Sequence, residues 1–379
     1  MTEEALSYYF PYTIDKQHHF RHFVEQGRDA FCKRHVPGYD GTNVGEFLYN
    51  KSGLSKEEIH DFEYLYENYA HWEEWFKNGK NIFSFQQALL SLLDKTDVSE
   101  ITPDKFHLPY DTFYLSLKPL HIKIANGREE VIEGVYIDHN IWNGHGEHPE
   151  GYCDLSFYFV GNFKQLFLEY IPHVKSRLED TSGAYDELPV GSFWNVWLSF
   201  EKKEGRENVK QAVAHFIQNL QAEILPKEHS LESGADTDFY NATVELLTNT
   251  INLVINCLLY LSQPTEKVEV EKRFPTGLPG NFDKQLSFAK TDKETKKIEE
   301  KINQLGFTKI RYVGQSFKRT VVAATADATV KAHWRRGHWR NQKFGEKLLQ
   351  DKMIWIMPTI VNSHIGDPLK GHIYDIEEK

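Results

Sequence analysis

The chain has 379 residues and a formal net charge of −11, and 40 % of its residues are hydrophobic, so it is long enough to bury a core in two or three domains or one large one. The acidic balance argues against a surface that binds nucleic acid non-specifically, because long-range repulsion would oppose a polyanion. The three cysteines are widely spaced and form neither a disulfide framework nor a CxxC zinc pattern, which favours a reducing cytoplasm.

The first part of the chain has helical patterns. Its acidic start lacks an apolar segment, so we expect no signal peptide. Residues 15–93 are predicted to be helical, and Ser55 with Glu58 has the pattern of a capping box. Apolar residues follow at helical spacing: Ile59, Phe62, Leu65, Tyr66 and Tyr69. His18 and His22 have the spacing of metal ligands on a helix, but no carboxylate completes a known motif, so a solvated or capping role is favoured.

From Thr112 onward the alternation of apolar and polar residues is typical of strands. The predicted strands cover residues 113–117, 121–124, 131–137, 155–160 and 193–200. Asn126-Gly127 predicts a tight hairpin turn between the second and third of them. Helices are predicted over residues 206–222 and 238–261. The second helix contains Asn249, Asn252 and Asn256, so it is expected to be a core helix rather than a membrane span.

The polar loop over residues 139–148 is a candidate site of another kind. His139, His145, His148 and Cys153 have the side chains that zinc prefers. A flexible glycine-containing loop rarely preorganises such a site, so we expect no metal, and without one the loop is a candidate rim of a binding cleft. No P-loop, G-x-S-x-G elbow or dinucleotide fingerprint occurs, and no cofactor is expected.

These patterns predict an α+β protein. It has a helical N-terminal part, a mixed or antiparallel central sheet backed by helices, and a β-rich C-terminal module. The expected segments are a helical region at 1–105, a central domain at 106–265, a linker or excursion at 266–304, and the C-terminal module at 305–379.

Residues 330–362 have a net positive charge, whereas the chain as a whole is negative. No acidic residue occurs from Val330 to Gly345, where five cations lie: Lys331, Arg335, Arg336, Arg340 and Lys343. The stretch is predicted to be a β-hairpin or part of a meander. Taken as a strand, it would place His338 and Arg340 on one face and Trp339 on the other, with Gly337 as a bulge or a close approach of backbones. Residues 341–351 are predicted to form a loop and 352–357 an apolar strand.

The residue types of this stretch suit recognition. Arginine offers a planar fork to carbonyl, carboxylate or phosphate oxygens, and tryptophan offers a face for stacking. The candidate ligand-binding residues are His333, Trp334, Arg335, Arg336, His338, Trp339, Arg340 and Asn362. Gly337, Trp355 and Pro358 are expected to support them. In the alternative interpretation the arginines stack on their own tryptophans and pair with carboxylates of this acidic chain.

The string His-x-Arg-Arg-Gly-His-Trp at residues 333–339, followed by Trp355, Pro358, Val361 and Asn362, resembles the C-terminal signature of a family of phage and mobile-element proteins. That family is named for an anti-CRISPR that blocks production of the type V-A effector nuclease. The weaker upstream likeness covers residues 134–137 and 257–260. The resemblance implies a non-enzymatic inhibitor in the cytoplasm of a bacterial host cell. It would recognise the nascent or N-terminal peptide of its target and lower the level of the mRNA, with the translating ribosome as a further partner and no membrane.

An enzymatic alternative stays open. A metal-independent ribonuclease could use His333 and His338 as general acid and base, while the arginine cluster stabilises a charged phosphorane. Five residues apart on one strand, the two imidazoles would face opposite ways unless Gly337 forms a bulge. A single-stranded RNA-binding protein that uses the same residues is the related alternative.

Overall fold

The computed structural model describes residues 9–123, 129–138, 152–162, 192–201, 207–224, 234–264, 267–315, 323–324 and 333–361. The chain divides into two compact units that cut across the four segments expected from the sequence. The first unit comprises residues 1–82, 112–114 and 273–310, and the second comprises 83–111, 115–272 and 311–379. Helices and mixed sheets together confirm the α+β class.

Helices and aromatic side chains form most of the first unit. Its elements are α1 (Phe10–His18), the 3-10 turn η2 (Phe20–Phe23), α2 (Arg28–His35), α3 (Val44–Asn50) and α4 (Lys56–Lys77). The predicted capping box begins α4: the Ser55 hydroxyl accepts from the Glu58 N–H, and the Glu58 carboxylate accepts from the Ser55 N–H. Trp72 and Trp75 are each 1 % exposed, and their indoles donate to the carbonyls of Pro11 and Asn81. Both tryptophans therefore belong to the core of this unit.

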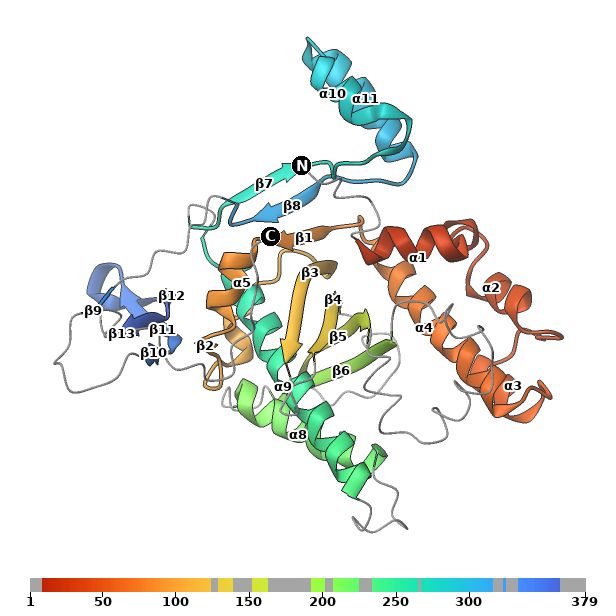
Figure 1. Cartoon of the computed structure of the whole chain (residues 1–379), viewed down its shortest axis with the longest axis horizontal. Helices are drawn as coiled ribbons and strands as arrows, with labels where there is room; N and C mark the ends of the chain where they lie inside the picture. The colour runs from red at the N-terminus through yellow and green to blue at the C-terminus, as the bar shows by residue number, and fades with distance from the viewer. Residues whose placement is uncertain are drawn as a thin grey trace. The chain divides into compact units, whose positions relative to one another are not determined.

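Residues 273–310 of the first unit contain regular elements in the stretch expected to be a linker. They include the 3-10 turn η4 (Pro279–Asn281), α10 (Phe282–Phe288) and α11 (Asp292–Gln304), and the two helices pack side by side (Figure 1). A small apolar core joins them, formed by Phe274, Leu278, Phe282 and Ile302. The Thr291 hydroxyl caps α11 by accepting from the Glu294 N–H at 3.2 Å. Local sequence patterns missed this core because charged residues separate its members.

A seven-stranded mixed sheet organises the second unit, in the order β6-β5-β4-β3-β1-β8-β7. Its strands are β1 (Ile82–Phe85), β3 (Thr112–Lys123), β4 (Glu129–Asp138), β5 (Tyr152–Asn162), β6 (Ser192–Glu201), β7 (Val270–Arg273) and β8 (Ile310–Val313). β4, β5 and β6 pair antiparallel, whereas β1 and β8 pair parallel. The two strands predicted over 113–124 are one strand, and the predicted Asn126-Gly127 turn lies outside the described residues.

Three α-helices accompany this sheet, α5 (Gln87–Leu93), α8 (Val209–Ile224) and α9 (Gly234–Leu261), and Figure 1 shows α8 and α9 crossing one face of its strands. The stripe predicted on α9 is buried: Leu247, Ile251, Val254, Ile255 and Leu258 are each at most 1 % exposed. Within the described residues, the segment 243–261 is long and apolar enough to cross a membrane, but 67 % of it is buried inside the protein, as a core helix requires. A short 3-10 turn, η3 (Pro103–Lys105), lies between α5 and β3.

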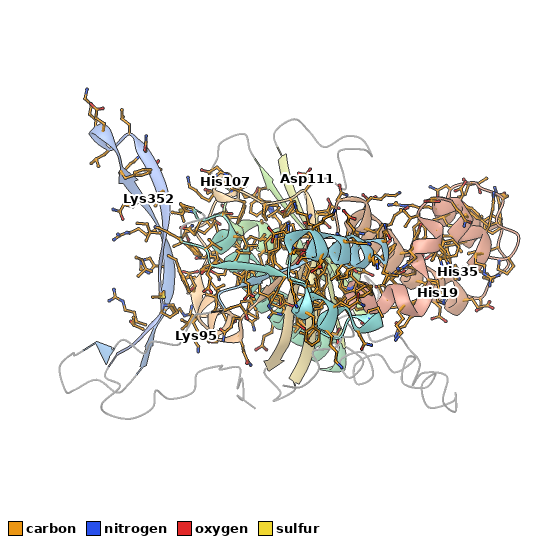
Figure 2. All side chains as sticks on the ribbon, turned by 90° about the horizontal axis from the view of Figure 1, so that it is seen from above. His19, His35, Lys95, His107, Asp111 and Lys352 are labelled. Carbon is orange, nitrogen blue, oxygen red and sulfur yellow. The ribbon has the colours of Figure 1, made fainter. Side chains whose placement is uncertain are left out.

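The C-terminal part of the second unit is rich in strands, as predicted. One small sheet has the order β10-β13-β9, from β10 (His333–Arg335), β13 (Thr359–Val361) and β9 (Ala323–Ala324). The other has the order β12-β11-β2, from β12 (Gln350–Ile356), β11 (Gly337–Phe344) and β2 (Thr96–Asp97). Figure 2 shows β11 and β12 as a long projecting hairpin on which Lys352 is labelled.

The predicted loop over residues 341–351 is wrong for its first four residues and its last two. β11 continues as far as Phe344, and its residues pair with β12 from Asn341↔Met353 to Phe344↔Gln350. The turn is restricted to residues 345–349 and includes the 3-10 turn η5 (Glu346–Leu348). The sequence pattern did not indicate this strand because its residues are mostly polar. Pairs between the two strands stabilise it instead: Lys343 pairs with Asp351, and Lys352 lies 5.0 Å from the centre of the Phe344 ring.

Candidate ligand-binding surface

Trp339 fixes the orientation of β11. Its side chain is 8 % exposed, and its Nε1 donates a hydrogen bond of 2.7 Å to Oδ1 of Asn256, a fully buried residue of α9. A buried indole N–H needs an acceptor, and Asn256 supplies it. The sequence predicted that Trp339 would offer a wall to a ligand. The structure instead places this indole in the interior, and so corrects that expectation.

Trp355 lies directly opposite Trp339 in the hairpin and packs on the same side. The two ring centres are 6.1 Å apart with an interplanar angle of 22°, and the Trp355 and Tyr260 rings form a T-shaped pair with their centres 5.8 Å apart. Trp355 Nε1 donates to Thr96 Oγ1 at 2.9 Å, and the Thr96 carbonyl accepts from Asn256 Nδ2 at 2.9 Å. Two indoles, a threonine and an asparagine thus anchor one face of the hairpin to β2 and α9.

Gly337 lies where β11 begins, against other backbone. Its N–H donates to the carbonyl of Lys95 at 3.0 Å. A Cβ added to Gly337 would lie 2.6 Å from Thr96 Oγ1, 2.8 Å from Pro358 Cδ and 3.0 Å from the carbonyl oxygen of Ile356. No side chain fits there without a shift, and the close approach of backbones explains the glycine. Pro358 is buried between β12 and β13, where it interrupts the strand.

The opposite face of β11 carries exposed cations. Alternation places His338 and Arg340 away from Trp339, and both are exposed. Arg335, at the end of β10, and Arg336, between the two strands, are also exposed. Arg335, Arg336, His338 and Arg340 are called the cationic surface below.

The arginines of the cationic surface have no carboxylate partner among the described residues. Arg340 donates to the Gln342 side-chain oxygen at 3.1 Å, a neutral acceptor on the same strand. Lys343 differs, since its ammonium lies 3.0 Å from the carboxylate of Asp351. Residues 333–361 contain six Lys or Arg and two acidic residues, for a net charge of +4 in a chain of −11. This excess of positive charge is what the surface can offer to a ligand.

Half-buried isoleucines lie beside these cations. In the register of the hairpin Arg340 is opposite Ile354, and His338 is opposite Ile356. Residues directly opposite in an antiparallel pair point to the same face. Both isoleucines are partly exposed, so this face combines cationic and apolar positions at strand spacing.

The remaining candidate residues lie in β10 or outside the described residues. β10 pairs His333 with Val361 and Trp334 with Ile360, which locates their backbones only. β10 and β11 belong to different sheets, so His333 and His338 do not lie on one strand, which was one case considered from the sequence. Asn362 and the loop 139–148 lie outside the described residues. Within the described ranges, no three His, Cys, Asp or Glu residues gather closely enough to hold a metal ion.

Sequence reasoning missed the residues that hold the hairpin in place, above all Asn256 and Thr96. Asparagine on the most apolar helix of the chain was the available signal, because a polar group buried there needs a partner. Nearby, burial raises the pKa of Asp94 to about 7. Burial also raises the pKa of the Cys257 thiol, and the Asp94 carboxyl adds to this effect. Asp94 therefore introduces a titratable carboxyl just before Lys95 and Thr96, which contact the hairpin.

Comparison with known proteins adds one family. A family model described as AcrVA2-like, the anti-CRISPR type V subtype A2 family, matches residues 83–363. Among solved structures, the chain is similar to one described as "Crystal structure of AcrVA2", with 13 % identity, a TM-score of 0.39, and coverage of 93 % of this chain and 97 % of that chain. No match is found among curated proteins. The family match contains the whole cationic surface.

Proposed function

The chain belongs to the anti-CRISPR type V subtype A2 family and is an anti-CRISPR protein, because the family model matches far more than half of the chain, and we propose that it lowers production of its target by binding a nascent polypeptide at the cationic surface. The target implied by the family resemblance is the type V-A effector nuclease. Binding during synthesis would lead to loss of the corresponding mRNA, in the cytoplasm of the bacterial host.

One observation carries this proposal. Arg335, Arg336 and Arg340 are exposed, and none of them is neutralised by a carboxylate within the described part of the chain. In the alternative interpretation these arginines would be buried and paired with carboxylates, and their role would be to stabilise the fold. Three guanidinium groups that keep their hydrogen-bonding capacity are suited to peptide carbonyls and acidic side chains.

A peptide fits the surface better than a nucleic acid. The indole of Trp339 is buried, so β11 does not present it to stack on a base. The formal charge of −11 opposes long-range attraction of a polyanion, whereas a short peptide segment carries few charges.

The test compares matched charge changes on one hairpin. Synthetic peptides from the N-terminal part of the type V-A effector nuclease are immobilised, and binding of wild type is compared with the triple variant Arg335→Gln, Arg336→Gln, Arg340→Gln. A hydrogen bond to a charged group contributes about 1.5–3 kcal/mol, so we expect the triple variant to bind at least about a hundredfold more weakly. Lys343→Gln removes a cation from the other face of β11 and is expected to bind like wild type.

A translation assay completes the experiment. A reporter fused to the same N-terminal segment should fall in protein and mRNA with wild type and with Lys343→Gln, but not with the triple variant. Equal binding by wild type and the triple variant would remove the cationic surface from the mechanism. Binding that occurs only to the message, with affinity that falls steeply with salt, would favour the RNA alternative instead.

A further inference from the structure

Two consecutive residues, Lys95 and Thr96, connect the hairpin to the rest of its unit. The Lys95 carbonyl accepts from the Gly337 N–H at 3.0 Å, and the Thr96 hydroxyl accepts from the Trp355 indole at 2.9 Å. Gly337 also lies opposite Thr96 where β2 and β11 pair in parallel. Figure 2 shows Lys95 on the side of the unit that carries the hairpin. The position of the cationic surface therefore depends on where residues 95 and 96 lie.

Asp94 directly precedes these two residues and ends α5. Its N–H donates to the carbonyls of Leu90 and Leu92. The Leu92 carbonyl also accepts from the Thr96 hydroxyl at 2.9 Å. A carboxylate at the C-terminal end of a helix meets the negative end of the helix dipole, so its charged form is disfavoured there. Asp94, the end of α5 and Thr96 thus form one connected group.

Few charges act on the Asp94 carboxyl. The charge of Lys95 favours ionisation, but burial opposes it more strongly and raises the pKa of Asp94 to about 7. On α9, which packs against α5, burial and the Asp94 charge raise the pKa of the Cys257 thiol well above its usual value, so this thiol is neutral near pH 7. On β2 the next carboxyl, Asp97, is exposed, and the hairpin packs two neutral indoles on this side. Asp94 is therefore the buried group here whose charge changes near neutral pH.

We propose that ionisation of Asp94 weakens the contacts of residues 95 and 96 with the hairpin, so that the cationic surface binds its ligand more tightly at mildly acidic pH than at neutral pH. The inference rests on the proposed function and concerns the regulation of the same surface. A carboxylate that becomes charged in a buried place is stabilised by moving toward water. Because Asp94 is covalently joined to Lys95, such a movement displaces the carbonyl and the hydroxyl that Gly337 and Trp355 contact.

Proton linkage gives the sign and the size of the effect. The hairpin is called attached while its contacts with Lys95 and Thr96 are made, and detached when they are broken. The pKa of Asp94 is about 7 in the attached form, and we expect the usual value of about 4 in the detached form. Because the pKa is raised, the attached form is fully favoured below about pH 4 and loses stability as pH rises toward 7. Between pH 5 and pH 7 the ratio of attached to detached hairpin should fall at least about tenfold.

Hydrogen exchange measures this ratio without any ligand. The reporters are the Gly337 N–H and the Trp355 indole N–H, with exchange rates corrected for their intrinsic dependence on pH. We expect their protection to fall at least about tenfold from pH 5 to pH 7 in the wild type, and by less than about twofold in Asp94→Asn. Asp97→Asn removes an exposed carboxylate of the same segment and should retain the wild-type dependence. Equal pH dependence in the wild type and Asp94→Asn would overturn the inference.

Peptide affinity then tests whether the attachment regulates binding. The N-terminal peptides are titrated at pH 5 and pH 7 against the wild type and Asp94→Asn, and the other titratable groups are the same in both proteins. From pH 5 to pH 7 the wild type should lose at least about threefold more affinity than Asp94→Asn, because fewer of its molecules have an attached hairpin. Equal losses in both proteins would overturn the regulation. If no peptide binds, the proposed function fails, and the exchange data alone decide whether Asp94 controls the hairpin.

Discussion

Arg28 in the helical unit and Arg340 on the hairpin carry the same guanidinium group in opposite surroundings. Arg28 donates to the carboxylates of Glu73 and Glu74, each at 2.7 Å. Glu73 is 1 % exposed and also accepts from Lys77 at 2.7 Å. Arg340 has one neutral acceptor, Gln342, and lies exposed. The first arrangement uses arginine to satisfy a buried acid and fix a helix, whereas the second leaves the guanidinium group of Arg340 exposed, with no carboxylate partner among the described residues.

Glu73→Ala should have the largest effect on the free energy of unfolding. It removes the carboxylate shared by Arg28, Lys77 and the hydroxyl of Tyr69. Breaking a buried ion pair costs about 3–5 kcal/mol, and we expect about 3 kcal/mol because Arg28 and Lys77 are partly exposed and regain water. Chemical denaturation at neutral pH measures this loss of stability. A loss below about 1 kcal/mol would mean that this network is no more structural than the cationic surface.

Acid should weaken the same network. Burial alone would raise the pKa of the Glu73 carboxyl, but hydrogen bonds from Arg28 and Lys77 hold it below its usual value. A carboxyl whose folded pKa is lowered stabilises the fold above its unfolded pKa, and this contribution is lost as pH falls through the folded pKa. The difference in stability between wild type and Glu73→Ala should therefore shrink in strong acid.

Asp94→Asn should have the next largest effect, of opposite sign. Burial raises the pKa of Asp94 to about 7, although the positive charge of the neighbouring Lys95 opposes this shift. A folded pKa above the unfolded value means that stability is lost as pH rises from about 4 to about 7. The variant should gain about 2 kcal/mol above pH 7 and nothing below pH 4, as measured by unfolding across pH. A gain that does not depend on pH would show that Asp94 has the same pKa in the folded and the unfolded state.

The substitution Trp339→Phe tests whether the Trp339 indole anchors the hairpin or contacts the ligand. The substitution keeps an aromatic ring but leaves Oδ1 of Asn256 without its donor in a fully buried position. An unsatisfied buried acceptor costs about 1–3 kcal/mol, so we expect stability to fall by about 1–2 kcal/mol. Peptide affinity should change much less than stability. Full stability with lost binding would instead return Trp339 to the ligand-facing role that the sequence predicted.

Local patterns predicted the elements whose causes are local. The capping box at Ser55 begins α4, and the apolar stripe of α9 faces the interior, because both depend on neighbouring residues. The face of β11 that is buried depends on Asn256, which lies 83 residues away in the sequence, and no periodicity carries that information. The division of residues 333–340 between two sheets depends likewise on the distant strands β2 and β13.

The smallest expected effect on the free energy of unfolding is that of the triple arginine variant, in contrast to Glu73→Ala. The triple variant Arg335→Gln, Arg336→Gln, Arg340→Gln removes three cations that neither fill the interior nor pair with a carboxylate in the described part of the chain. Surface substitutions of this kind change stability by about 0.5 kcal/mol or less, and removal of mutual repulsion within a segment of net charge +4 favours the fold slightly. Denaturation should thus give the wild-type midpoint while peptide binding is lost. A marked loss of stability would show that these arginines have structural partners, and the distinction between the two kinds of arginine would no longer hold.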